Sequence, residues 1–121
     1  MDEQEFYLGL DGDSIGRVIE SYLITNKPDK LNEFSLSISN AISEISDIVR
    51  DNEGTVIFYG GDSILYKGAL NKELGEKILK VFFERTGKTA SIGIGKTTTE
   101  SYLAMKLAKA NGGNQVVVFD R

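Results

Sequence analysis

The sequence predicts a single α+β domain over residues 1–121, in which an antiparallel sheet carries helices on one face. Length supports this prediction, because 121 residues is the size of one domain. Composition supports it as well, since 40% of the residues are hydrophobic and 26% are charged, as in ordinary globular proteins. Strand-like and helix-like stretches also alternate along the chain, without a linker or an internal repeat.

The first three elements are a strand and two helices. Phe6–Asp11 is a short apolar run that ends in Asp-Gly-Asp, which is typical of a strand followed by a turn. A short helix is expected over Ser14–Ile24, and Pro28 opens a second one, because proline is favoured in the first turn. Apolar residues recur every three or four positions in the second helix, so it is amphipathic. They are Leu31, Phe34, Ile38, Ile42, Ile45 and Val49.

A hairpin and a third helix follow. Thr55–Tyr59 and Ser63–Lys67 have the composition of strands, and Gly60-Gly61-Asp62 between them predicts a tight turn. The helix is predicted from apolar residues at helical spacing. They are Leu74, Ile78, Val81 and Phe82.

The chain closes with a strand, a helix and a strand. Thr89–Gly95 alternates as a strand does. Thr97-Thr98-Thr99-Glu100 spells a capping box for a helix that ends near Asn111-Gly112-Gly113, and Val116–Phe119 is the last strand. With the two consecutive helices counted as one, the first six elements follow the β-α-β-β-α-β order of a ferredoxin-like fold, and an α-β unit follows them.

The face of the sheet away from the helices is expected to be lined by small residues. Alternation places Gly9 and Asp11 on one side of the first strand, and Ser91, Gly93 and Gly95 on one side of the fourth. Glycine within a strand often marks the close approach of a ligand or of another backbone, although two glycines also relieve twist. We therefore expect an open face with small residues and one carboxylate.

Composition excludes several classes of function. The chain has no Cys and no His, so it has no disulfide, no zinc site built on these residues and no serine–histidine hydrolase chemistry. The net charge is −4 without a basic tract, so stable nucleic-acid binding is not expected. Met1–Glu5 is acidic and no long apolar run is present, which predicts a cytoplasmic protein without membrane insertion.

Two carboxylates are expected to meet at one end of the sheet. Asp11 ends the first strand and Asp62 lies on the hairpin turn, and a ferredoxin-like sheet places the first strand beside the third. Two like charges about 4 Å apart repel by roughly 4 kcal/mol at an effective dielectric of 20, and a divalent cation removes that repulsion. Oxygen ligands favour Mg²⁺ (or Mn²⁺), and the carbonyl of Gly12 offers a further ligand.

A phosphate-binding turn is expected beside this cation. Gly12, Asp13 and Ser14 lie between the first strand and the first helix, where backbone amides at a helix N-terminus attract phosphate. Plainer interpretations remain open at this point, since Asp13 or Ser14 is also a suitable N-cap and Gly60-Gly61-Asp62 is also an ordinary hairpin turn. The pairing of the two motifs at neighbouring places favours the functional interpretation.

Four segments carry a pattern that belongs to a known group. They are Asp11–Gly16, Phe58–Ser63, Ala90–Gly95 and Ala108–Asn114. In this order they resemble the palm domain shared by GGDEF cyclases, class III nucleotidyl cyclases and the polymerase-like large subunit of type III CRISPR effectors. The chain is most similar to the minimal CRISPR polymerase (mCpol) proteins, which consist of little more than this palm, and the resemblance spans nearly the whole chain.

The resemblance implies a role for each polar residue of these segments. Asp11 and Asp62 would be the catalytic carboxylates that bind metal, and Gly60 and Gly61 would let the backbone approach the nucleotide. Lys109 aligns with the lysine of the family's Ala-Lys-x-x-Gly segment, which reaches the nucleotide phosphates.

Four positions depart from the pattern or add to it weakly. Ser63, also a candidate nucleotide contact, stands where the CRISPR subunit has a second Asp and GGDEF cyclases have Glu, which leaves the number of metal ions open. Ile19 and Glu20 replace the Asn-Asp pair that GGDEF enzymes carry near guanine, so a guanine readout of that type is not expected. Lys106 lies three residues before Lys109 and is a weaker candidate for nucleotide contact.

The implied reaction is nucleotidyl transfer, in which a ribose hydroxyl attacks the α-phosphorus of a nucleoside triphosphate and pyrophosphate leaves. The implied product is a cyclic oligonucleotide, in the first instance a cyclic dinucleotide made from ATP in antiphage defence, and a separate effector, membrane-bound or not, would sense it. A cyclic dinucleotide needs two nucleotides face to face, so we expect a homodimer joined across the open sheet face. Three alternatives remain: a GTP cyclohydrolase of the archaeal palm type, a non-catalytic nucleotide-binding module, and a structural interaction domain.

Overall fold

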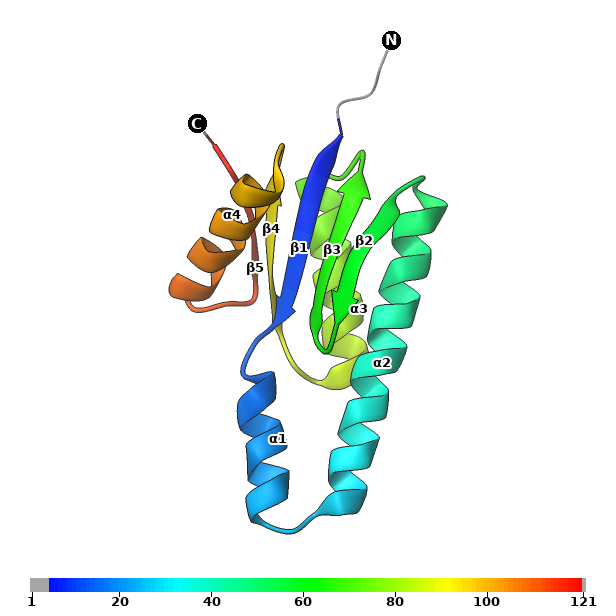
Figure 1. Cartoon of the computed structure of the whole chain (residues 1–121), viewed down its shortest axis with the longest axis vertical. Coiled ribbons are helices and arrows are strands. Elements are labelled where there is room, and N and C mark those ends of the chain that lie inside the picture. The colour runs from blue at the N-terminus through cyan, green and yellow to red at the C-terminus, as the bar shows by residue number, and fades with distance from the viewer. Residues whose placement is uncertain (1–4, 121) are drawn as a thin grey trace.

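A computed structural model describes residues 5–120, and Figure 1 shows their arrangement. The acidic residues 1–4, on which the expectation about a targeting signal rested, lie outside the described residues. Within the described range the fold is of the α+β class, as predicted, with one five-stranded sheet and four helices. The strands are β1 (Phe6–Gly12), β2 (Thr55–Gly60), β3 (Ser63–Gly68), β4 (Ala90–Gly95) and β5 (Gln115–Val118). The helices are α1 (Ile15–Ile24), α2 (Pro28–Asp51), α3 (Lys72–Thr86) and α4 (Thr98–Ala110).

Strand β1 is the centre of a sheet with the order β2-β3-β1-β4-β5. It runs antiparallel to β3 and β4, and β5 runs parallel to β4. The register places Asp11 opposite Ser63 on one side and opposite Ser91 on the other. The expectation that the first strand lies beside the third is therefore confirmed, and the end of β1 reaches the hairpin turn.

The main core lies between the sheet and helices α2 and α3. Leu8 and Leu10 of β1 point into it and are almost fully buried, as strand alternation predicts. Tyr66 of β3 is buried there as well, and its hydroxyl shares a hydrogen bond of 3.3 Å with Ser46 of α2. Burial raises the pKa of Tyr66 to about 12. This polar pair fixes the height of α2 over the hairpin.

Helix α4 covers the opposite face of the sheet, at the left of Figure 1. Gly93 of β4 makes this possible, because a Cβ added there would lie 2.2 Å from both the Met105 nitrogen and the Ser101 oxygen. Ser101 Oγ also donates a hydrogen bond of 2.9 Å to the Gly93 carbonyl. The expectation of an open small-residue face is therefore wrong over β4, where the glycines admit a helix backbone. Helices occupy both faces, and a homodimer across Gly93 is excluded.

The capping box at the start of α4 is confirmed. Thr97 Oγ1 accepts a hydrogen bond of 3.1 Å from the Glu100 amide, and Glu100 Oε1 accepts one of 3.0 Å from the Lys96 amide. The two bonds satisfy amides that the helix itself leaves unpaired. This helix start is therefore set by local sequence.

Strand β2 contains a β-bulge that the sequence pattern did not predict. Val56 pairs with Tyr66, and the next paired residue is Phe58, which lies opposite Leu65. Ile57 is thus the additional residue, and every side chain after it points to the face opposite the one that simple alternation gives. Phe58 consequently shares the face of α4, while Tyr59 turns toward α2.

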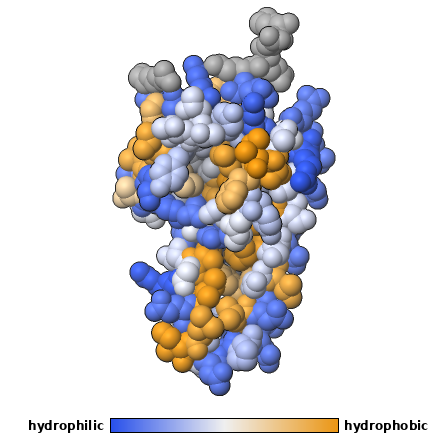
Figure 2. All heavy atoms as spheres, in the orientation of Figure 1, coloured by the Kyte–Doolittle hydropathy of each residue, from blue (hydrophilic) through white to orange (hydrophobic). Residues whose placement is uncertain are grey.

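Helix α1 and the N-terminal part of α2 extend past the end of the sheet (Figure 1). The rings of Tyr22 and Phe34 join the two helices edge to face, with centroids 6.3 Å apart. Figure 2 shows apolar side chains gathered over this end, where Leu23 and Ile24 are exposed. None of the helices within residues 5–120 is both long and apolar enough to cross a membrane.

Candidate functional site

The carboxylates of Asp11 and Asp62 converge where β1 ends, as the topology predicted. The Gly12 amide donates a hydrogen bond of 3.2 Å to the Asp62 carbonyl, which ties the hairpin turn to the end of β1. A Cβ added to Gly12 would lie 2.5 Å from Ile15 Cγ1 and 2.9 Å from Asp62 Oδ2, so a larger residue would crowd the buried Ile15 and push the carboxylate aside. Burial, and then the negative charge of Asp11, raise the pKa of Asp62 above its usual range. The two like charges therefore act on each other in the folded protein.

Ser63 is a partner of this pair. Its Oγ donates a hydrogen bond of 2.5 Å to Asp11 Oδ1 across the strand pair. The bond orients the Asp11 carboxylate and adds no charge of its own. Where an acidic residue would add a ligand, Ser63 holds one oxygen of Asp11 in place.

Lys109 of α4 places its ammonium among three oxygens. Its Nζ lies 3.0 Å from the Gly12 carbonyl oxygen, 3.2 Å from Asp11 Oδ2 and 3.2 Å from Asp13 Oδ1. Burial alone would lower the pKa of Lys109, but the hydrogen bonds and charges of Asp11 and Asp13 outweigh it and raise that pKa. The lysine is therefore a permanent cation that counters these carboxylates.

Asp13 connects several parts of the chain through its carboxylate. Its carboxylate accepts hydrogen bonds from Thr89 Oγ1 at 2.8 Å, Ser91 Oγ at 2.7 Å and the Asn114 amide at 2.9 Å, besides the contact with Lys109. Burial would raise the pKa of Asp13, but these hydrogen bonds outweigh it and lower that pKa. The expected contact with nucleotide is not open to this side chain, because four donors already occupy it. The Asp13 amide is occupied as well, since it donates a hydrogen bond of 2.9 Å to the Thr89 carbonyl.

The N-terminus of α1 is open. Ser14 adopts a left-handed backbone conformation, with φ of 59°, and its side chain makes no capping hydrogen bond. Ser14 is thus the N-cap residue, as one alternative interpretation had it, but it caps the helix without a side-chain hydrogen bond. The first turn contains no acidic residue, and a Cβ added to Gly16 would meet no described atom within 4 Å. The space beside Gly16 is therefore open, and the partial positive charge of this helix N-terminus lies next to the end of β1.

The hairpin turn and Lys106 frame the site on its outer side. Gly61 has a φ of 60°, which favours glycine, and a Cβ added to it would meet no described atom within 4 Å. Gly60 lies under the Phe58 ring, because a Cβ added to Gly60 would lie 3.1 Å from Phe58 Cζ. Lys106 is exposed, and its ammonium lies 5.8 Å from the centre of the Tyr102 ring.

Sequence reasoning missed the partners of Asp13. Thr89 and Asn114 were not identified as site residues, and Ser91 was noted only as a small residue. The sequence did hold a signal for two of them, because Ser91 and Asn114 each lie inside one of the four segments that resemble the palm domain. The structure shows that Asp11 and Asp13 join all four segments through their hydrogen bonds and ion pairs.

The donor set fits a single magnesium ion. Among residues 5–120 no three acidic side chains are placed to hold a metal ion together. Asp13 is already bonded to four donors, so the oxygens available are the carboxylates of Asp11 and Asp62 and the Gly12 carbonyl. Magnesium commonly uses one or two carboxylates and takes its other ligands from water and substrate phosphates. Moreover, Asp11 Oδ2 and the Gly12 carbonyl oxygen already contact one cation, the ammonium of Lys109. These oxygens are therefore arranged to accept positive charge.

Comparison with protein families agrees with this geometry. The profile of the family described as minimal CRISPR polymerase domain (mCpol) matches residues 7–119. The chain belongs to the mCpol family. A comparison with curated protein sequences found no match. The family resemblance inferred from the four sequence segments is therefore confirmed.

Solved structures show which folds this mCpol domain is similar to. The GGEEF domain of a diguanylate cyclase from Vibrio cholerae superposes with a TM-score of 0.68 at 14% identity, over 97% of this chain and 83% of that one. The GGDEF domain of DgcB from Caulobacter crescentus, in complex with c-di-GMP, gives 0.69 at 13% identity, over 97% and 78%. The Csm1–Csm4 cassette in complex with pppApA gives 0.69 at 21% identity, over 93% of this chain and 20% of that one.

These findings establish the fold and the family. The mCpol domain has the palm fold of GGDEF cyclases and of Csm1. Its family is one of palm-domain polymerases and cyclases, which supports a nucleotidyltransferase-type activity.

Proposed function

We propose that this mCpol domain is a metal-dependent nucleotidyltransferase that makes a cyclic oligonucleotide, in the first instance a cyclic dinucleotide from ATP. One observation carries the proposal. Asp11 Oδ2 and the Gly12 carbonyl surround a cation position that Lys109 fills, with Asp62 beside them and the open end of α1 next to them. This arrangement suits a magnesium triphosphate.

Asp11, Asp62 and the Gly12 carbonyl would hold Mg²⁺ (or Mn²⁺). Bound there, the ion would lower the pKa of an attacking hydroxyl and neutralise charge on the leaving group. In the reaction, a ribose hydroxyl oxygen bonds to the α-phosphorus of a second nucleotide, and the bond from that phosphorus to the bridging oxygen breaks. Pyrophosphate leaves with the electron pair, and the hydroxyl proton passes to water. This chemistry needs no histidine as general base, so a chain without histidine could perform it.

The phosphates would lie between α1 and α4. Lys109 loses its place beside Asp11 when a divalent cation enters, and its ammonium is then free to pair with the β- and γ-phosphates. The first-turn amides of α1 and the open backbone at Gly61 supply further uncharged contacts. Together these contacts would orient the triphosphate and leave the ribose near the carboxylates.

Cyclisation calls for a second copy of the chain. Attack needs the hydroxyl of one nucleotide within about 3–3.5 Å of the α-phosphorus of another, and one palm holds one triphosphate. A symmetric homodimer with facing sites meets this need with one surface used twice. Because α4 covers Gly93, the dimer contact would use the rim of the site, around the hairpin turn.

The neighbours support the choice of substrate and role. The GGDEF domain of DgcB was solved in complex with c-di-GMP and the Csm1–Csm4 cassette in complex with pppApA, so proteins of similar fold bind dinucleotides. We extend this to ATP as substrate and to a cyclic signal in antiphage defence, read by a separate effector, membrane-bound or not. The protein would act in the cytoplasm without stable nucleic-acid binding.

The test is incubation of the purified chain with each nucleoside triphosphate and Mg²⁺ or Mn²⁺, followed by product mass and pyrophosphate release. Asp62→Asn should abolish turnover, while Asp47→Asn, which changes an exposed carboxylate on α2, should leave it unchanged. A cyclic product with pyrophosphate supports the proposal. A ring-opened product from GTP would instead identify a cyclohydrolase, and tight ATP binding without turnover would identify a binding module.

A further inference from the structure

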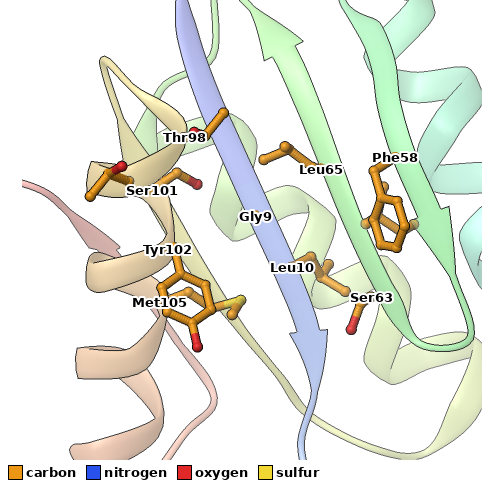
Figure 3. A pocket seen from close by; sticks show the side chains of 11 residues that line it. Gly9, Leu10, Phe58, Ser63, Leu65, Thr98, Ser101, Tyr102 and Met105 are labelled. Atoms are coloured by element: carbon orange, nitrogen blue, oxygen red, sulfur yellow. The ribbon is translucent and has the colours of Figure 1, made fainter.

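A groove of about 500 Å³ runs between α4 and the β2–β3 hairpin, over the face of β1 (Figure 3). Its floor is Gly9, and a Cβ added there would lie 3.1 Å from Ser101 Oγ and 3.8 Å from Met105 Sδ. The missing side chain therefore keeps the floor low. A volume of this size is typical of a site for a small organic ligand.

The groove is continuous with the carboxylate pair. Ser63 lines one end of it, and the Oγ of this residue donates the hydrogen bond to Asp11. Gly9 precedes Asp11 by two residues on β1, which is about 7 Å along a strand. That separation is comparable to the span of a ribose, so a nucleotide with its α-phosphate at Asp11 reaches the middle of the groove with its base.

Two aromatic rings flank the groove. Phe58 comes from β2 and Tyr102 from α4, and Figure 3 shows them on opposite sides of the Gly9 strand. Their residues are 57% and 55% exposed, so a ligand can reach their faces. Phe58 is there only because the bulge at Ile57 reverses its direction, and bulges often redirect a side chain next to a binding site.

The lining selects a neutral ligand. Among the described residues that line the groove, none is Asp, Glu, Lys or Arg, and the polar groups are hydroxyls such as those of Ser101 and Thr98. A phosphate would find no cation among these lining residues, the ammonium of Lys106 lying beside the Tyr102 ring. A flat heterocycle, in contrast, finds aromatic faces and hydroxyls that both donate and accept.

We propose that this groove binds the base of the nucleotide whose phosphates lie at Asp11 and Lys109, with Phe58 and Tyr102 as stacking surfaces. The inference rests on the proposed function and adds the location of the base and the way it is recognised. Stacking accepts any base with a large π-face, so the site prefers purines over pyrimidines without a strict choice between adenine and guanine.

The experiment compares two probes, ATP and inorganic tripolyphosphate, each with Mg²⁺, by calorimetric titration. Phe58→Ala and Tyr102→Ala should each weaken ATP binding by roughly 5- to 150-fold, the range of one base–aromatic stack, and should leave tripolyphosphate binding unchanged. Phe83→Ala is the matched control, because Phe83 is 53% exposed on α3 and lies outside this groove. Phe58→Tyr keeps the ring and should restore ATP affinity.

A second readout follows the base itself. The fluorescence of 2-aminopurine riboside triphosphate should be quenched on binding to the wild type, and Phe58→Ala should remove the quenching. If Phe58→Ala and Tyr102→Ala bind ATP as tightly as the Phe83→Ala control, the base lies elsewhere and the proposed function still stands. If Phe58→Ala instead halves the mass in light scattering with ATP affinity unchanged, the groove is covered by a second copy and the inference is wrong. A wild type that binds neither probe overturns the proposed function and the groove assignment with it.

Discussion

Replacing Lys109 by methionine should strengthen the binding of a divalent cation to the nucleotide-free protein and weaken the binding of ATP. Methionine keeps much of the length of the side chain and removes its charge. In the wild type, an entering cation must displace the ammonium from Asp11 Oδ2 at 3.2 Å and from the Gly12 carbonyl at 3.0 Å. In Lys109→Met this competitor is absent.

The magnitude follows from Coulomb's law. Two unit charges 3.2 Å apart attract by about 1.3 kcal/mol in water and by about 5 kcal/mol at an effective dielectric of 20. The side chains of Lys109 and Asp11 are 28% and 27% exposed, so solvent screens the pair and the value lies near the water limit. We expect a gain of about 1–2 kcal/mol, which is a roughly 5- to 30-fold tighter cation.

The assay is Mn²⁺ titration of nucleotide-free protein by electron paramagnetic resonance, followed by ATP titration. Lys106→Met is the control on the same helix, because the ammonium of Lys106 lies over the Tyr102 ring, whereas that of Lys109 pairs with Asp11. Lys72→Ala, at the outer start of α3, is the control for ATP. Unchanged or weaker Mn²⁺ binding in Lys109→Met would refute the competition, and equal ATP affinities for Lys109→Met and Lys72→Ala would show that Lys109 is only a surface charge.

Three further variants test the site and the fold. Asp62→Asn should leave the stability of the metal-free protein unchanged or slightly raised. The reason is that the pKa of Asp62 is raised in the folded state, so its ionisation destabilises the fold as pH rises. Thermal melts with and without Mg²⁺ should show stabilisation by the ion only in the wild type. Asp13→Asn should cost about 2–3 kcal/mol at pH 7. The lowered pKa of Asp13 means that this cost shrinks as pH falls below 3.8, which urea unfolding at pH 7 and pH 3 would reveal; an equal cost at both would contradict the hydrogen-bonded carboxylate. Gly93→Ala should destabilise by about 2–3 kcal/mol in the same assay, because its Cβ meets two backbone atoms of α4, whereas Gly16→Ala has open space and should not; equal stabilities would mean that α4 does not lie against Gly93.

Much of the fold was predictable because its signals are local. Helical periodicity identified α2, the capping box identified α4, and the turn at Gly60–Asp62 identified the hairpin. The convergence of Asp11 and Asp62 then followed from topology alone, since a central first strand must end beside the turn. Each of these inferences needed only a few neighbouring residues.

The remaining features depend on contacts between distant parts of the chain. Strand glycines signal a close approach, and Gly93 alone does not say whether a ligand or the backbone of α4 approaches. A bulge adds one residue without altering composition, so the direction of Phe58 was hidden. The partners of Asp13 lie 76 and 101 positions away in Thr89 and Asn114, beyond the reach of any local pattern.

The charges around Lys109 have a consequence for the stoichiometry of metal binding. Asp11, Asp13 and Asp62 contribute three negative charges and Lys109 one positive charge, which leaves the cluster with the charge that one divalent cation balances. In the nucleotide-free protein, where Lys109 can leave Asp11 and still pair with Asp13, a first Mg²⁺ would bring the cluster to neutrality, and a second would gain no net attraction unless a triphosphate arrived with it. With Ser63 in place of an acidic residue, the nucleotide itself must supply the charge that admits a second ion, so the number of metals becomes a property of the substrate complex.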